Sequence, residues 1–230
     1  MPELLRAGPA SILGLRWLAR VGPSPMDAWA CAMGWGLRAA QSHSQRLERE
    51  GWLRRYAMTR GNGSLLVATD GGIRVGELEL SAAPRPTPTW WAHGCACAWT
   101  AAWLTVRRAD WRGPREVLAD PNLVGKLEWQ TGTGWRRATH RPDLVLSIPN
   151  GVVVVEVELR RKSSKRLAAV LSLYRSWLAD SKLAGVVYVC GSTALAERVE
   201  RFSTDAGIPN HAARFELLDD VQAQALRVGE

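Results

Sequence analysis

HRPDLVLSIPNGVVVVEVELRRKSSKRL, residues 140–167, decides how the C-terminal part of this chain is expected to fold. Two apolar runs flank Asn150-Gly151, a dipeptide typical of a tight β-hairpin turn. The second run contains Glu156 and Glu158, and side chains two residues apart point to the same face of a strand. The stretch therefore predicts a β-hairpin with acidic side chains gathered on one face.

The position of the turn determines which residues of the two strands lie opposite each other. If Asn150 and Gly151 form the loop, Asp143 lies directly opposite Glu158, and Glu156 shares their face. The other face is then entirely apolar and suited to packing on helices; it carries Leu144, Leu146, Ile148, Val153, Val155 and Val157. Like charges directly opposite each other destabilise a sheet. We therefore expect either a divalent cation or neighbouring basic side chains to offset the three carboxylates.

The sequence around the hairpin predicts a mixed sheet flanked by helices. The basic run RRKSSKR, residues 160–166, precedes a helix with apolar residues at helical spacing, and then comes the buried strand GVVYVCGS, residues 185–192. A strand, a helix and a second strand in this order form a right-handed unit with parallel strands. Upstream, residues 92–108 are expected to be helical, and a strand is expected within residues 115–130.

These residues resemble the restriction-endonuclease-like, or PD-(D/E)xK, nuclease superfamily over about residues 90–205. Pro142-Asp143 matches the PD element, and the segment from Glu156 to Glu158 occupies the (D/E)xK position. The resemblance implies a divalent metal held by Asp143 and Glu156, which activates water against a phosphodiester. Mg²⁺ is the expected ion, with Mn²⁺ as the alternative.

The third position of that motif departs from the superfamily pattern. Glu158 stands where a lysine is usual, so we count it as a third candidate catalytic and metal-binding acid beside Asp143 and Glu156. Lys162 and Lys165, in the basic run that follows, are the candidates for the missing positive charge, and Lys162 joins the expected catalytic set.

The first 80 residues begin with a helical rhythm. A first helix is expected to end near Gly22, and Ser24 is expected to cap a second helix that ends near Gly34. A third helix is expected over Leu37–Glu50, before a glycine. Its apolar stripe is expected to contain Leu37, Ala40 and Leu47.

Two short strand-like runs follow, at Trp52–Met58 and Ser64–Ala68, with the glycine-rich segment TRGNG between them. Thr69 or Asp70 is expected to cap a further helix toward Leu80. The segments SQRLEREGWLRRY and SLLVATDGGIRVGE resemble the recognition helix, wing and closing helix of the winged helix-turn-helix family. This resemblance covers about residues 10–80.

The resemblance implies that the third helix enters the major groove of double-stranded DNA and that the wing touches its backbone. The side chains it implies in DNA binding are Arg38, Gln41, Ser42, Gln45, Arg46 and Arg49, with Arg60 on the wing.

SAAPRPTPT, residues 81–89, is expected to be an extended linker because proline recurs at every second position. The expected organisation is a winged-helix domain over residues 1–80 and a nuclease-like domain over residues 90–230. The expected fold class is α/β in the broad sense, α+β over the whole chain, with a winged helix-turn-helix followed by a mixed sheet flanked by helices.

The composition points to a polyanionic partner. The formal net charge is +8, and the hydrophobic fraction of 47% is enough for a globular core. No apolar run reaches the length of a membrane-spanning helix, and the first 22 residues are too interrupted for a secretory signal. We therefore expect a cytoplasmic protein with no membrane partner.

The combination of RPDLVL, VVVEVELRRKSSKRL and GVVYVC with the N-terminal pattern resembles the replication-relaxation family of plasmid and mobile-element proteins. The resemblance implies sequence-specific DNA binding in replication or DNA relaxation. Two hypotheses stay open: a metal-dependent DNA endonuclease or nickase, and a non-catalytic DNA-binding initiator or regulator with a degenerate nuclease-like domain. Solvated carboxylates paired with nearby basic residues are the third interpretation. A homodimer and contacts with other replication or transfer proteins also stay open.

Overall fold

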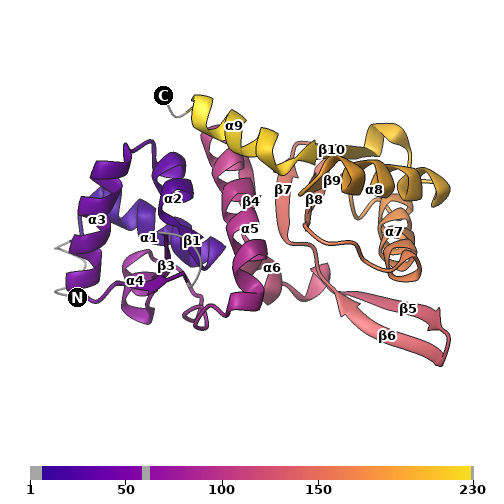
Figure 1. Ribbon diagram of the computed structural model, residues 1–230, viewed down its shortest axis with the longest axis horizontal. Helices are drawn as coiled ribbons and strands as arrows, with labels where there is room; N and C mark the ends of the chain where they lie inside the picture. Colours follow the sequence, from indigo (N-terminus) through magenta and orange to yellow (C-terminus); the bar gives the residue numbers. More distant parts are fainter. Residues whose placement is uncertain (1–6, 59–62, 229–230) are drawn as a thin grey trace. The chain divides into compact units, whose positions relative to one another are not determined.

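The computed structural model describes residues 7–58 and 63–228, and its fold is a mixture of helices and mixed or antiparallel sheets (Figure 1). Two compact units share the chain. Unit 1 contains the described residues up to Arg108, together with Gly113–Glu116 and the segment that begins at Gln222. Unit 2 contains Ala109–Arg112 and Val117–Val221. The α+β class expected from the sequence is confirmed.

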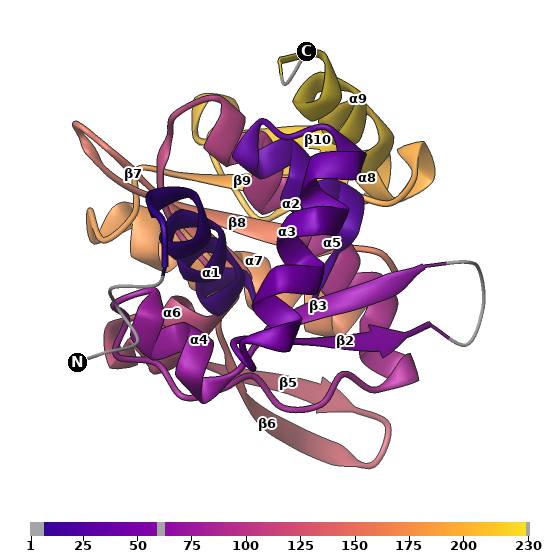
Figure 2. The ribbon, with the colours of Figure 1, turned by 90° about the vertical axis from the view of Figure 1, so that its left-hand side faces the viewer.

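Unit 1 begins with helices and a small antiparallel sheet, whose helices α1–α3 and strands β2 and β3 face the reader in Figure 2. The sheet has the strand order β1-β3-β2. Its elements are α1 (Pro9–Val21), β1 (Ser24–Pro25), α2 (Met26–Met33), α3 (Leu37–Arg49), β2 (Leu53–Ala57), β3 (Ser64–Ala68) and α4 (Asp70–Val75). The helices and strands expected here are confirmed in type and order.

Two local predictions in unit 1 were wrong. Ser24 does not cap α2: it pairs with Leu66 of β3, and its hydroxyl donates to the carbonyl of Pro25. The last helix of the segment, α4, ends at Val75 and does not reach Leu80. Thr69 caps it as expected, by accepting from the amide of Gly72.

Helix α5 (Pro88–Val106) belongs to unit 1, where it packs against α2. The expected domain boundary at residues 81–89 therefore differs from the boundary between the two compact units, which lies near Arg108. Residues 81–87 contain neither helix nor strand, as a Pro-rich stretch predicts. None of the described helices is both long and apolar enough to cross a membrane.

Unit 2 is built on a five-stranded sheet in the order β10-β9-β8-β7-β4. β8, β9 and β10 are parallel, whereas β7 is antiparallel to both β8 and β4, so the expected mixed sheet is confirmed. The strands are β4 (Asp110–Arg112), β7 (Leu144–Ile148), β8 (Gly151–Glu158), β9 (Gly185–Cys190) and β10 (Ala213–Leu217). The remaining helices are α6 (Pro114–Ala119), η2 (Pro121–Leu123), α7 (Ser164–Ala179), α8 (Thr193–Asp205), η3 (Asn210–Ala212) and α9 (Leu218–Val228).

The register of the β7–β8 hairpin differs from the expected one by two residues. Leu144 pairs with Val155 and Ile148 pairs with Gly151, so the prediction that Asp143 lies opposite Glu158 was wrong. The physical reason is Gly151, which takes a φ of 133° as the first residue of β8, so the loop moves back toward Pro149. Because the shift is an even number of residues, every side chain keeps its expected face.

The helices of unit 2 cover the face that carries the carboxylates. Val145 and Val154 of that face form a buried core with Leu171 and Tyr174 of α7 and with Val199 of α8. α7 and α8 thus lie on the carboxylate face, and Leu144, Val155 and Val157 of the opposite, apolar face are buried as well. This placement buries the acidic end of the hairpin beside α7.

A second hairpin, β5 (Gly125–Thr131) and β6 (Gly134–His140), forms a separate two-stranded sheet. The strand expected within residues 115–130 therefore exists but lies outside the main sheet. β5 packs closely on α7: a Cβ on Gly125 would come within 2.1 Å of the side chain of Leu173. Glycine at this position allows the two elements to approach.

Candidate carboxylate site

The acidic end of β8 is buried. Glu156 and Glu158 are only 2% and 5% exposed. Asp143, half-buried, precedes β7 and continues its pairing: its amide donates to the carbonyl of Val155 over 3.1 Å. Its carboxylate Oδ2 accepts from the amide of Val157 over 2.8 Å. Asp143 therefore lies beside Glu156 and replaces a backbone carbonyl as the acceptor for β8.

Glu156 is held by two side chains from different elements. The Tyr174 hydroxyl, on α7, donates to its Oε1, and Nε2 of His140, at the end of β6, lies 3.1 Å from the same oxygen. The same His140 nitrogen lies 2.8 Å from the Tyr174 oxygen. Burial by itself raises the pKa of Glu156, but His140, Lys162 and Tyr174 together hold that pKa below its ordinary value.

Glu158 is paired with Lys162, which lies in the loop between β8 and α7. The Lys162 ammonium donates to Oε2 of Glu158. Burial raises the pKa of Glu158, and the charges of Glu156 and Asp143 raise it further against the effect of Lys162. Burial acts to lower the pKa of Lys162, but Glu156, Glu158 and Asp143 raise it overall. All three acids therefore act electrostatically on Lys162.

Tyr188 adds a second buried hydroxyl to this region. It lies on β9 directly beside Glu156, and its Oη is buried without a hydrogen-bond partner among the described residues. Burial raises its pKa well above the ordinary value, and the charges of Glu156 and Glu158 act in the same direction. A buried polar atom without a partner marks a place where the packing has not been optimised for stability alone.

The donor types of this site suit a divalent cation of the Mg²⁺ type, although the oxygen atoms of its three acids do not all lie within 4.8 Å of one another. Carboxylate oxygens are the ligands that such hard cations prefer, and Asp143, Glu156 and Glu158 supply them from one end of one hairpin. Lys162 already offsets part of the negative charge. The sequence left open whether a cation or basic neighbours offset the three carboxylates. The structure shows that a basic neighbour offsets part of their charge.

The structure brings together Asp143, Glu156, Glu158 and Lys162, the four residues predicted for this site, whereas Lys165 is exposed. Sequence reasoning missed His140 and Tyr174. In the sequence, His140 is a single histidine before the PD element, and Tyr174 lies among the apolar residues at helical spacing that follow the basic run. A polar tip on a buried tyrosine is the signal that was available, because a buried hydroxyl usually has a partner.

The residues predicted to bind DNA lie on α3 in unit 1. Ala40, Ser44 and Leu47 form its buried side. The predicted residues are all exposed: Arg38, Gln41, Ser42, Gln45, Arg46 and Arg49. Leu37, expected on the apolar stripe, is 55% exposed instead, because it is the first residue of the helix. Arg46 also donates to the hydroxyl of Ser11.

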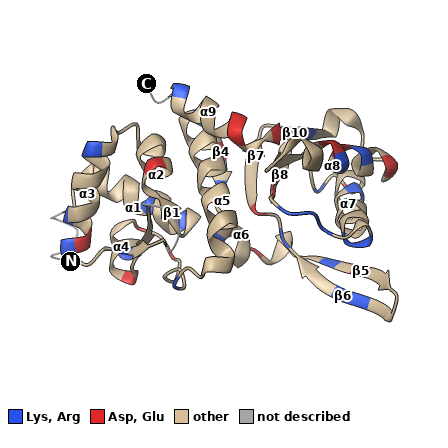
Figure 3. Cartoon of the chain, in the orientation of Figure 1, with Lys and Arg blue, Asp and Glu red and all other residues tan. Residues whose placement is uncertain are grey.

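Arg60, predicted on the loop between β2 and β3, lies outside the described residues. Figure 3 colours the basic residues blue, both on α3 and along the loop between β8 and α7. The two groups belong to different units.

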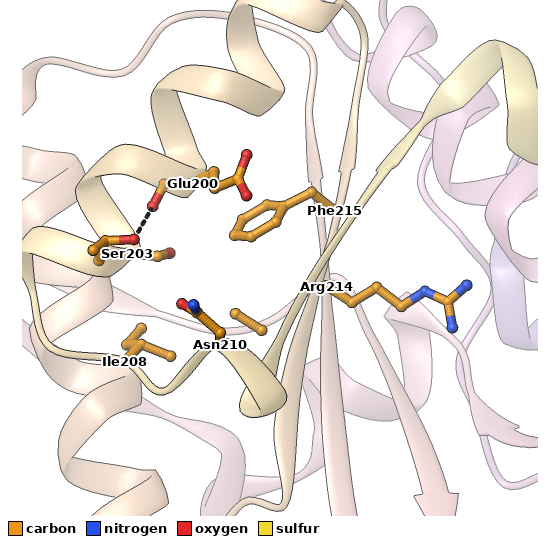
Figure 4. Close-up of a pocket in the computed structure, with 8 residues that line it drawn as sticks. Glu200, Ser203, Ile208, Asn210, Arg214 and Phe215 are labelled. Carbon is orange, nitrogen blue, oxygen red and sulfur yellow. Dashed lines mark hydrogen bonds between the residues drawn. The ribbon is translucent and has the colours of Figure 1, made fainter.

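A separate pocket of about 230 Å³ lies between α8 and β10 (Figure 4). Phe215 and Asn210 point into it, whereas Arg214 points away and pairs with Glu216 over 2.6 Å. Ser203 lines the pocket with a buried hydroxyl that has no partner among the described residues. None of the predicted site residues lines this pocket.

No protein-family model matches the sequence, and the search of curated proteins gives no match. Among solved structures, the chain is similar to protein VC1899 from Vibrio cholerae, with 12% identity and a TM-score of 0.36. The likeness covers 97% of this chain and 56% of that one, so the chain spans little more than half the length of VC1899. A TM-score this low carries no argument. The resemblances to known families stay predictions.

Proposed function

We propose that the chain is a DNA-binding protein and a metal-dependent DNA endonuclease or nickase. The observation that supports this most is the position of Lys162. Its ammonium contacts Glu158 and lies within electrostatic reach of Asp143 and Glu156. The groups proposed for hydrolysis are then three acids and one lysine. Glu158 replaces the usual lysine of the motif, and Lys162 supplies the positive charge from the next loop.

In this proposal, Asp143, Glu156 and Glu158 hold a divalent cation, most favourably Mg²⁺. Such a cation, when bound, polarises a phosphodiester and lowers the pKa of water. Lys162 provides a fixed positive charge near the phosphate, where negative charge increases during hydrolysis. His140 and Tyr174 position the Glu156 carboxylate through its Oε1. A rigid carboxylate is favourable because catalytic groups must be held close to their productive geometry.

Unit 1 supplies the proposed recognition of double-stranded DNA. Its element order, with α3 followed by the β2–β3 hairpin, agrees with a winged helix-turn-helix. The exposed side of α3 carries arginine and glutamine, which are common readers of bases and phosphates. The proposed context is the replication or relaxation of a plasmid or mobile element, in the cytoplasm.

The test is a nicking assay on supercoiled plasmid with Mg²⁺, Mn²⁺ or EDTA. We expect metal-dependent nicking that Asp143→Asn and Glu158→Gln reduce by about 100-fold or more, because each removes a charged ligand. Asparagine retains an oxygen that accepts from the amide of Val157, so the hairpin should stay folded. Lys165→Met is the matched control for Lys162→Met because Lys165 is exposed. Unchanged nicking by the Asp143→Asn, Glu158→Gln double variant would refute the catalytic assignment.

A non-catalytic DNA-binding initiator or regulator is the second candidate. The observation that favours it is that Glu156 already has Tyr174 and His140 as partners, while Glu158 has Lys162. A protein that shifts duplex DNA in a gel, but gives no nicking with either metal, would support this candidate over the first.

A further inference from the structure

The β5–β6 hairpin forms its own sheet in unit 2 and extends away from the main sheet of that unit (Figures 1 and 2). Its two strands have seven residues each. Only one side is anchored: Gly125 and the buried Leu127 face the body of unit 2, and β5 packs against α7. Residues near the tip are exposed on both strands.

The outward face of this hairpin combines an aromatic ring with basic groups. Trp135 is 70% exposed and lies opposite Gln130. Two positions along the same face, Arg137 pairs with Glu128 over 2.8 Å, and beyond it lies the exposed Lys126. Arg136 is exposed as well, but it lies on the opposite face of the hairpin, across from Trp129.

An exposed tryptophan alone is ordinary, but its position among cations is informative. The outward face contains two basic residues, Lys126 and Arg137, against one acid, Glu128. Proteins that hold single-stranded nucleic acid combine a basic surface that follows the phosphates with aromatic rings that stack on unpaired bases. The outward face of the hairpin contains both parts.

We infer that the β5–β6 hairpin binds single-stranded nucleic acid, with Trp135 stacking on an unpaired base and Lys126 and Arg137 contacting phosphates. This inference rests on the proposed function in DNA processing and adds a substrate feature to it: unpaired nucleotides next to the cleavage site. The base of the hairpin leads into that site, because His140 is the last residue of β6 and contacts Glu156. A strand held along the hairpin is thereby directed toward the carboxylates.

The partner class follows from charge complementarity. An acidic protein segment would pair with the basic side chains but would not explain the exposed tryptophan near the tip. An unpaired nucleic-acid base that stacks on the ring explains it. Duplex DNA has its bases stacked internally, so Trp135 has no exposed base face to meet there. Single-stranded DNA and single-stranded RNA share the required chemistry, and the experiment separates them.

The test measures the binding of the full chain to fluorescein-labelled oligo(dT), oligo(U) and a duplex by fluorescence anisotropy. We expect Trp135→Ala to weaken single-strand binding by about five-fold or more and to leave duplex binding unchanged. Lys126→Ala with Arg137→Ala should make the fall of log K with log salt less steep, by about 0.7 for each phosphate that is no longer neutralised. Trp90→Ala is the matched control, because Trp90 is 50% exposed and lies in unit 1.

Equal single-strand affinity for the wild type, Trp135→Ala and Trp90→Ala would overturn the inference, and so would no binding of either oligonucleotide by the wild type. A protein-binding role for the hairpin would give the first of these results. Failure of the proposed function is distinguishable. Loss of single-strand binding in Trp135→Ala, together with no metal-dependent nicking by the wild type, supports the hairpin inference and refutes only the catalytic assignment.

Discussion

At the scale of a residue, the hydroxyls of Tyr174 and Tyr188 differ in whether they have a hydrogen-bond partner. Both tyrosines are almost fully buried on the carboxylate face of unit 2. The Tyr174 hydroxyl donates to Glu156, whereas that of Tyr188 has no partner among the described residues. A hydrogen bond to a charged group contributes about 1.5–3 kcal/mol, and a buried polar group without a partner costs about 1–3 kcal/mol. Removal of the two hydroxyls should therefore have opposite effects.

We predict that Tyr174→Phe lowers the free energy of unfolding at pH 7 by about 1.5–3 kcal/mol. The matched variant Tyr188→Phe should leave stability unchanged or raise it, because it removes an unsatisfied polar atom. Urea unfolding followed by circular dichroism measures both. Equal destabilisation by the two variants would contradict the assigned hydrogen bond.

The pH dependence of that difference follows from the pKa of Glu156, which is held below its ordinary value of 4.5. A carboxyl group with a lowered pKa in the folded state contributes stability above the unfolded pKa and loses it as the pH falls through the folded pKa. We predict that the gap between wild type and Tyr174→Phe is constant near neutral pH and shrinks below pH 4.5. A gap that grows on acidification would mean that Tyr174 stabilises protonated Glu156.

A further residue-scale prediction concerns the Glu158–Lys162 pair, whose side chains are 6% and 20% exposed. Lys162→Met leaves a buried carboxylate without its cation, which costs about 3–5 kcal/mol for a buried pair. The double variant Glu158→Gln, Lys162→Met should recover most of this loss, since no uncompensated charge remains. Thermal unfolding of both variants measures the recovery. A double variant no more stable than Lys162→Met would show that the lysine acts through packing alone.

At the scale of an element, helix α3 has one face that packs on unit 1 and an exposed face for which DNA binding is proposed. Ala40, Ser44 and Leu47 hold it on unit 1, and the opposite side is exposed. Arg46 is exposed, but its guanidinium also donates to the hydroxyl of the buried Ser11 and so helps to hold the helix in place. Its substitution would therefore mix a loss of stability with any loss of DNA binding.

We predict that Gln45→Ala and Arg49→Ala each weaken duplex DNA binding by about 1–3 kcal/mol without a change in melting temperature. Arg227→Ala, an exposed arginine of α9, is the matched control for charge. Gel-shift titration at a fixed salt concentration measures the affinities. Equal losses in the control and in Arg49→Ala would mean that only net charge matters.

The elements of unit 2 also show what the sequence determines locally and what it leaves to the rest of the chain. The common face of Asp143, Glu156 and Glu158 was predictable because strand periodicity is local. The register was not, since it depended on whether Gly151 belongs to the loop or to β8. The contact of Tyr174 with Glu156 joins a helix to a strand across 18 positions, and only the packing of α7 specifies it. The pairing of β5 with β6 was also missed, although it is a local hairpin in which Thr131 pairs with Gly134.

Domain organisation belongs to the scale of the whole molecule. Because α5 packs on α2, a cut at residues 81–89 removes part of unit 1. We predict that a fragment of residues 1–108 has a higher melting temperature than a fragment of residues 1–83, and a higher helix content per residue. Circular dichroism of the two fragments is the measurement. A fragment of residues 1–83 that melts at the same temperature would show that α5 contributes no stability to unit 1.

Unit 1 is discontinuous, because the indole nitrogen of Trp103 donates over 3.1 Å to Gln224, which follows the whole of unit 2 in the chain. On the ribosome, residues 9–106 leave the exit tunnel first but cannot complete their own contacts. Unit 2 must emerge before the segment from Gln222 arrives. During that interval α5, 19 residues long and without a charged side chain, depends on nascent neighbours or a chaperone to shield it from solvent. Order of synthesis and order of folding are thus opposed in this chain.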